Sequence, residues 1–205
     1  MPEIGGGMPG MGGGNENTGN GGSSSTTNGD DSVFDTSTPI NESQTDQFDN
    51  ERVRFPTASR GKITNVYGGP GGGPFALTRN DDKPITSIKY TAGNWANLDM
   101  LKTVELLAFD APQPPGAGFE KAREGYIVAG IEANYGKYVF AIRVIYMKRG
   151  TDGKPDPSDQ YTGEWLGNKL DQAKTVKIAG DGSQVIGICG RKGLTLDAVG
   201  LIVLE

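Results

Sequence analysis

The chain has 205 residues, and its charge is distributed unevenly along them. Residues 1–60 carry nine acidic and three basic side chains, whereas residues 61–205 carry sixteen and seventeen. The second part is therefore nearly neutral, which argues against a nucleic-acid or membrane-surface partner. There is no histidine, which removes His-dependent triads and most zinc sites, and the single cysteine, Cys189, permits no intramolecular disulfide. We predict neither a cofactor nor a metal.

The composition predicts a disordered Gly/Ser/Asn-rich acidic tail over residues 1–60 and one folded domain over residues 61–205. The tail has too few apolar side chains to offset the entropy of ordering its backbone. Met1 is followed by neither a basic n-region nor an apolar h-region, and no run approaches the ~18 apolar residues of a membrane span. If Met1 is the native start, we expect a soluble, cytoplasmic protein.

From Gly61 onward, short apolar runs alternate with Gly, Pro, Asn and Asp, which is typical of an antiparallel all-β domain. The run around Arg143 would place Phe140, Ile142, Val144 and Tyr146 on one face. In chain order the expected strands are KITNVYG (62–68), PFALT (74–78), PITSIKYTAG (84–93), MLKTVELLAF (100–109), GYIVAGIEANY (125–135), KYVFAIRVIYMK (137–148), GEWLG (163–167), KTVKIAG (174–180), SQVIGICG (183–190) and LDAVGLIVL (196–204).

Two segments, 109–125 and 148–165, are expected to be long connections because of their prolines and turn residues. The spacing of Asp152, Asp156 and Asp159 suits a hard cation, since calcium takes several oxygens from one loop. No bidentate glutamate follows in register, and we favour ordinary turns over a calcium site.

Three motifs together resemble the jacalin-related lectins. They are the glycine loop VYGGPGGGPF (66–75), the strand pair KPITSIKYTAGNWANLDMLKTVELLAF (83–109) and the closing segment GDGSQVIGICGRKGLTLDAVGLIVL (180–204). The resemblance runs in order over residues 61–205, with loops 110–124 and 149–160 departing from it. It implies a β-prism of three Greek-key sheets in which the first and last motifs are adjacent and hold a sugar between them.

The resemblance implies a single carbohydrate site, for a mannose/glucose- or galactose-type glycan. Its expected residues are Gly69 of the first loop, Gly193, Leu194, Thr195 and Asp197 of the closing loop, and Tyr135 and Tyr138 of a flanking loop. Physically, Asp197 would accept hydrogen bonds from two adjacent hydroxyls while the N–H groups of Leu194 and Thr195 donate. Glycines at 69 and 193 would let backbone approach where a Cβ would collide.

The sequence also departs from the family. Leu194 stands where many mannose-type members have a polar residue, and Pro70 stiffens the first loop and removes one donor. Neither other repeat carries a second G-x-x-x-D loop. One shallow site of a few hydrogen bonds implies affinity on the order of 0.1–1 mM, so effective binding would need several copies, through a homo-oligomer or a tether.

Alternatives stay open at this point. Asp197 could simply bond nearby loop N–H groups. Trp95 and Trp165 are expected in the core rather than stacked on a sugar, and Cys189 is expected to pack as a small hydrophobe. Nothing in the spacing suggests an enzyme, and a β-prism with a degenerate site would be a structural or protein-interaction module. The distinguishing feature is whether Asp197 lies exposed beside Gly69 or is closed over by Leu194 and loop 133–138.

Overall fold

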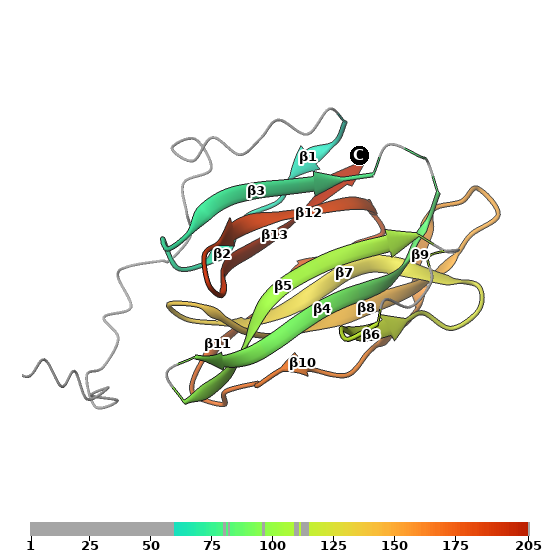
Figure 1. Cartoon of the computed structure of the whole chain (residues 1–205). Coiled ribbons are helices and arrows are strands. Elements are labelled where there is room, and N and C mark those ends of the chain that lie inside the picture. The colour runs from blue at the N-terminus through green and yellow to red at the C-terminus, as the bar shows by residue number, and fades with distance from the viewer. Residues whose placement is uncertain are drawn as a thin grey trace, which may run out of the picture. The chain divides into compact units, whose positions relative to one another are not determined.

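The computed structural model describes residues 60–79, 81, 83–95, 97–108, 111 and 115–204, with the side chain of Trp95 left out. The predicted tail therefore lies almost entirely outside the described residues. The described part forms thirteen strands and no helix, arranged in three antiparallel sheets (Figure 1). In the same residues, no helix has the length and apolar character needed to cross a membrane.

The first sheet joins the beginning and the end of the domain. Its strand order is β1–β13–β12–β3, and β2 also pairs with β13. Because β1 and β2 pair with the last strand, the first glycine loop is held beside the closing hairpin. The strands are β1 (Lys62–Ile63), β2 (Tyr67–Gly68), β3 (Gly73–Thr78), β12 (Gln184–Lys192) and β13 (Leu196–Leu204).

The other two sheets come from the middle of the chain. One has the order β10–β8–β7–β11, with β9 also pairing with β8, and the other has the order β5–β4–β6. The five strands of the former are β7 (Tyr126–Tyr135), β8 (Val139–Arg149), β9 (Pro155–Thr162), β10 (Leu166–Gly167) and β11 (Lys174–Ala179). The three strands of the latter are β4 (Ile85–Trp95), β5 (Leu98–Ala108) and β6 (Gly118–Lys121).

The core is built from the inward faces of all three sheets. Ile88 and Leu101, Ile142 and Val144, and Leu201 are each at most 1 % exposed and belong to one hydrophobic cluster. Tyr146 joins the same cluster, as the alternation along β8 predicts. The all-β, three-sheet fold class expected from the sequence is confirmed.

Several expectations about individual segments were wrong. The two long connections each contain a strand: β6 pairs with β4, and β9 pairs with β8. β9 lies at the edge of its sheet, where the N–H that a proline lacks is not needed for the ladder. The expected strand at 62–68 is split into β1 and β2, and the one at 163–167 is reduced to two residues. Trp165 is half-buried, with the Arg143 guanidinium 4.9 Å from its ring centre, rather than in the core.

Two smaller predictions are confirmed. Cys189 is fully buried, and burial raises the pKa of its thiol to about 12. Asp152 and Asp156 each accept a hydrogen bond from the backbone N–H two residues on, which is turn chemistry. Asp159 instead accepts a hydrogen bond from the Tyr126 hydroxyl.

Candidate carbohydrate site

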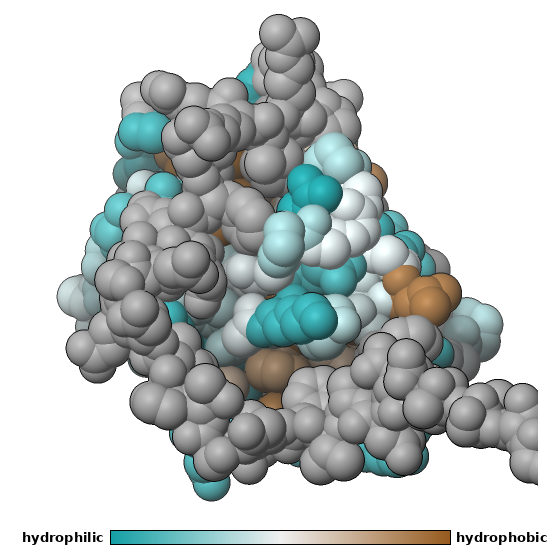
Figure 2. All heavy atoms as spheres, turned by 90° about the vertical axis from the view of Figure 1, so that its left-hand side faces the viewer, coloured by the Kyte–Doolittle hydropathy of each residue, from teal (hydrophilic) through white to brown (hydrophobic). Residues whose placement is uncertain are grey.

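The turns of the β7–β8 and β12–β13 hairpins meet the loop between β2 and β3 at one end of the three sheets. The shared contacts centre on Gly69, whose N–H donates to the Asp197 carbonyl at 2.8 Å. A β-carbon on Gly69 would lie 2.0 Å from the Lys137 carbonyl oxygen, so this position must be glycine. Figure 2 looks onto this end, where hydrophilic side chains gather near the centre and a hydrophobic patch lies toward one edge.

Asp197 is the only acidic residue in the three segments that meet here, 68–73, 135–139 and 190–197. It is the second residue of β13 and is 5 % exposed, and its Oδ2 accepts the Gly193 N–H at 2.9 Å. No described residue donates a hydrogen bond to Oδ1, and this atom is not fully buried. Burial raises the pKa of the Asp197 carboxyl, opposed by the Gly193 N–H and the positive charge of Arg191.

Three residues that the sequence analysis did not assign shape the space around this carboxylate. A β-carbon on Gly71 would lie 2.5 Å from Asp197 Oδ1, and one on Gly72 would lie 2.6 Å from Oδ2. Arg191 donates from Nε to the Gly71 carbonyl at 2.8 Å and from Nη2 to the Gly72 carbonyl at 2.6 Å. The glycine loop is thus tied to β12 and pressed against the carboxylate. The run of glycines hinted at this contact, but nothing in the sequence pointed to Arg191.

In the closing loop, protein atoms leave space around Gly193. A β-carbon there would stand 3.5 Å from both Asp197 Oδ2 and the Gly72 Cα, which is ordinary contact, so no protein atom requires glycine at this position. The Gly193 N–H also approaches the Thr195 carbonyl at 3.0 Å. Thr195 is buried at 3 % exposure, whereas Leu194 projects into solvent at 70 %. Leu194 therefore forms part of the rim rather than a closed cover.

The flanking loop supplies one wall. Tyr135 ends β7 nearly buried, with its ring tilted against that of Tyr67 at a centroid distance of 5.6 Å. Tyr138 is half-buried, and its carbonyl accepts the Gly136 N–H at 2.9 Å, which closes the hairpin turn. The side chain of Tyr135 serves packing, while the turn residues between the two tyrosines contact the glycine loop. The structure thus brings every residue expected at the site into one neighbourhood.

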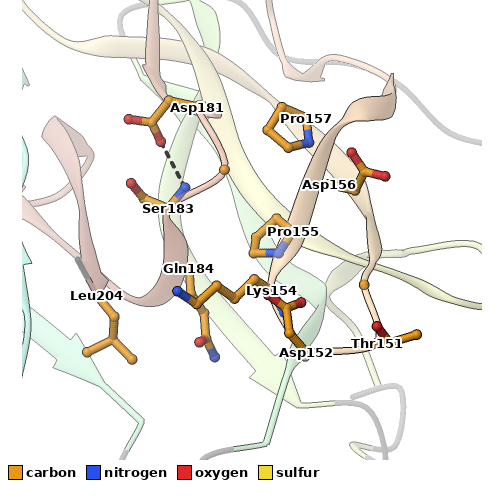
Figure 3. Close-up of a pocket in the computed structure, with 12 residues that line it drawn as sticks. Thr151, Asp152, Lys154, Pro155, Asp156, Pro157, Asp181, Ser183, Gln184 and Leu204 are labelled. Atoms are coloured by element: carbon orange, nitrogen blue, oxygen red, sulfur yellow. Dashed lines mark hydrogen bonds between the residues drawn. The ribbon is translucent and has the colours of Figure 1, made fainter.

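A separate cavity of about 700 Å³ lies at the other end of β12 and β13, where Gln184 pairs with Leu204. Figure 3 shows side chains that line it, including Asp152, Asp156 and Asp181. Nine residues of β12 separate it from the closing loop, a distance of about 30 Å at 3.3 Å per residue. This cavity is not part of the candidate site.

The domain has a β-prism fold, with its first and last segments paired as the resemblance implied. Comparison with solved structures finds the same fold in jacalin-related lectins, at low sequence identity. Artocarpin, a lectin with mannose specificity, matches with a TM-score of 0.51 and 15% identity over 72% of this chain and 100% of its own.

Two further lectins match at a similar level. Frutapin, a lectin from Artocarpus incisa, matches with a TM-score of 0.50 and 13% identity over 73% of this chain and 100% of its own. Calsepa lectin, solved with a bisected glycan, matches with a TM-score of 0.50 and 14% identity over 72% of this chain and 100% of its own. No protein-family model and no curated sequence matches the chain. The expected resemblance to jacalin-related lectins is therefore confirmed for the fold.

Proposed function

We propose that this protein is a non-catalytic carbohydrate-binding module that holds one hexose at the end of the prism where Gly69, Gly193 and Asp197 meet. The observation that carries the proposal is the different bonding of the two Asp197 carboxylate oxygens. One oxygen is fixed by the Gly193 N–H, while the other has no donor among the described residues and is not fully buried. A carboxylate held in this way is oriented to accept hydrogen bonds from sugar hydroxyls.

The surrounding backbone supports the same role. The protein itself does not require glycine at position 193. The φ of Gly193 is outside the left-handed region, and protein atoms leave room for a β-carbon. An approaching ligand supplies a reason for its small size. The mannose specificity of artocarpin and the glycan bound by Calsepa lectin, which have the same fold, agree with a saccharide ligand.

The second candidate function is a structural or protein-interaction β-prism. The observation in its favour is the 5 % exposure of Asp197, which leaves little of the side chain accessible before a ligand binds. The two functions differ in what they require of that carboxylate. A lectin depends on its charge, whereas a scaffold only needs an acceptor for the Gly193 N–H, which an asparagine side chain also provides.

The test is a glycan array probed with multivalently displayed protein and, in parallel, with Asp197→Asn. Multivalency is needed because one shallow site gives affinity on the order of 0.1–1 mM. We expect the wild-type protein to bind hexose-terminated glycans and the variant to lose that binding while remaining folded. Silence of the wild-type protein across mannose, glucose and galactose series would refute the lectin function and leave the interaction module.

A further inference from the structure

Three cationic residues flank the candidate site, and the structure distinguishes their roles. The Arg191 guanidinium donates hydrogen bonds to the carbonyls of Gly71 and Gly72. Lys137 and Lys192 are exposed, and neither ammonium forms an ion pair or hydrogen bond with a described residue. The loops around the site thus carry two positively charged side chains that have no ion-pair or hydrogen-bond partner in the described part of the chain.

The backbones of both lysines contact the glycine loop of the site. A β-carbon on Gly72 would lie 2.3 Å from the Lys192 carbonyl carbon and 2.6 Å from Asp197 Oδ2, so one glycine touches both residues. On the other side, the Lys137 carbonyl abuts Gly69, whose N–H is bonded to the Asp197 carbonyl. The backbones of Lys137 and Lys192 therefore contact the glycine loop at two different glycines, Gly69 and Gly72, both of which also contact Asp197.

Nothing on these segments neutralises the two ammonium groups. Segments 68–73, 135–139 and 190–197 contain two lysines and one arginine but a single acidic residue, Asp197. The Lys137 ammonium lies 6.0 Å from the centre of the Tyr138 ring, at the outer limit of a cation–π contact. Acidic side chains gather instead around the cavity at the opposite end. A domain close to neutral overall thus presents a positive rim at its candidate site, which would attract and orient an anionic ligand.

We propose that the saccharide bound at this site is anionic, bearing a carboxylate or sulfate group that the ammonium groups of Lys137 and Lys192 contact while Asp197 accepts hydrogen bonds from ring hydroxyls. The proposal rests on the lectin function proposed above and specifies its substrate class. Charge-assisted hydrogen bonds are about twice as strong as neutral ones, so an anionic substituent would discriminate between otherwise matched sugars. A neutral hexose would leave both ammonium groups unused.

The experiment compares two matched pairs of multivalent conjugates on one carrier: glucose against glucuronate, and mannose against mannose 6-sulfate. Binding is measured at low and high salt for the wild-type protein, for the Lys137→Gln/Lys192→Gln double variant, and for the matching Lys→Arg double variant. Lys154→Gln, at the distant cavity, is the control for loss of any one charge. We expect the anionic sugar to bind the wild-type protein about tenfold more tightly at low salt, with the difference shrinking as salt screens the charges.

The double glutamine variant should bind both members of a pair alike, whereas the double arginine variant and Lys154→Gln should keep the preference. Equal binding of neutral and anionic sugars by the wild-type protein would overturn this inference and leave the lectin function intact. Equally tight binding of polyacrylate, an anionic polymer without sugar, would overturn it as mere charge attraction. Absence of binding to either member of both pairs would overturn this inference, and the lectin function would fall only if the galactose series of the array were silent as well.

Discussion

Gly71 and Gly193 both touch the Asp197 carboxylate, but their predicted tolerance of a methyl group is opposite. Neither has a φ in the left-handed region, so alanine is allowed at both by backbone conformation. A β-carbon on Gly71 would lie 2.5 Å from Asp197 Oδ1 and 3.0 Å from Cγ, which forces the carboxylate to move. On Gly193 the nearest atoms are 3.5 Å away, and nothing needs to shift.

The magnitude of the Gly71→Ala effect follows from the bond that the displaced carboxylate gives up. Asp197 Oδ2 holds the Gly193 N–H at 2.9 Å, and a hydrogen bond to a charged group contributes about 1.5–3 kcal/mol. In a domain of this size 1 kcal/mol corresponds to about 2–4 °C in Tm, so Gly71→Ala should lower Tm by about 3–12 °C. Gly193→Ala should raise Tm by about 1–4 °C, because alanine restricts the unfolded chain.

Differential scanning calorimetry of the two variants measures these shifts, and saccharide binding is measured on the same samples. We expect both variants to bind sugar at least tenfold more weakly, Gly71→Ala because Asp197 is displaced and Gly193→Ala because its methyl group occupies space left for the ligand. Equal Tm values for the two variants would refute the close contact between Gly71 and the Asp197 carboxylate. Unchanged sugar binding by Gly193→Ala would refute the reason given for that glycine.

Three further predictions concern other groups. Burial raises the pKa of the Glu120 carboxyl, and the negative charge of Glu164 adds to the effect. The contribution of Glu120 to stability is therefore greatest below the unfolded pKa of about 4.5 and is lost as pH rises through the folded pKa. Glu120→Gln should flatten this decline when the free energy of unfolding in urea is measured against pH. Asn134 is fully buried and bonds the loop before β11, through the Leu170 N–H at 2.9 Å among others, so Asn134→Ala should cost about 2–4 kcal/mol in urea unfolding, and a loss under 1 kcal/mol would contradict this role. Arg191→Met should weaken sugar binding and move its loss at acid pH to higher pH, because the Arg191 charge holds down the pKa of Asp197; a weakened variant with an unshifted pH profile would make Arg191 merely structural.

The sequence predicted the fold well because its signals are periodic and local. The alternation along β8 placed Ile142 and Val144 in the core, and the glycine loop and closing segment identified the prism. The strands β6 and β9 were missed because prolines and turn residues dominate their surroundings, and an edge strand tolerates both.

The candidate site was only partly predictable from sequence. Asp197 and Gly69 could be named because their segments follow a recognisable pattern. The Arg191 contacts with Gly71 and Gly72 join residues about 120 positions apart, and no local pattern encodes such a pairing. The space left by protein atoms around Gly193 could not be predicted either, because it depends on how separate loops pack.

Saccharide binding is proposed at the end of the prism where the glycine loop meets the closing hairpin. The most direct measurement is a titration of ¹⁵N-labelled protein with a soluble saccharide identified by the array, followed by the backbone amide signals. We expect the amide signals of Gly69, Gly71, Gly193 and Leu194 to shift together and to reach saturation, and Asp197→Asn to abolish these shifts. Shifts confined to the distant cavity around Asp152 and Asp181, or equal shifts in Asp197→Asn, would contradict this proposal.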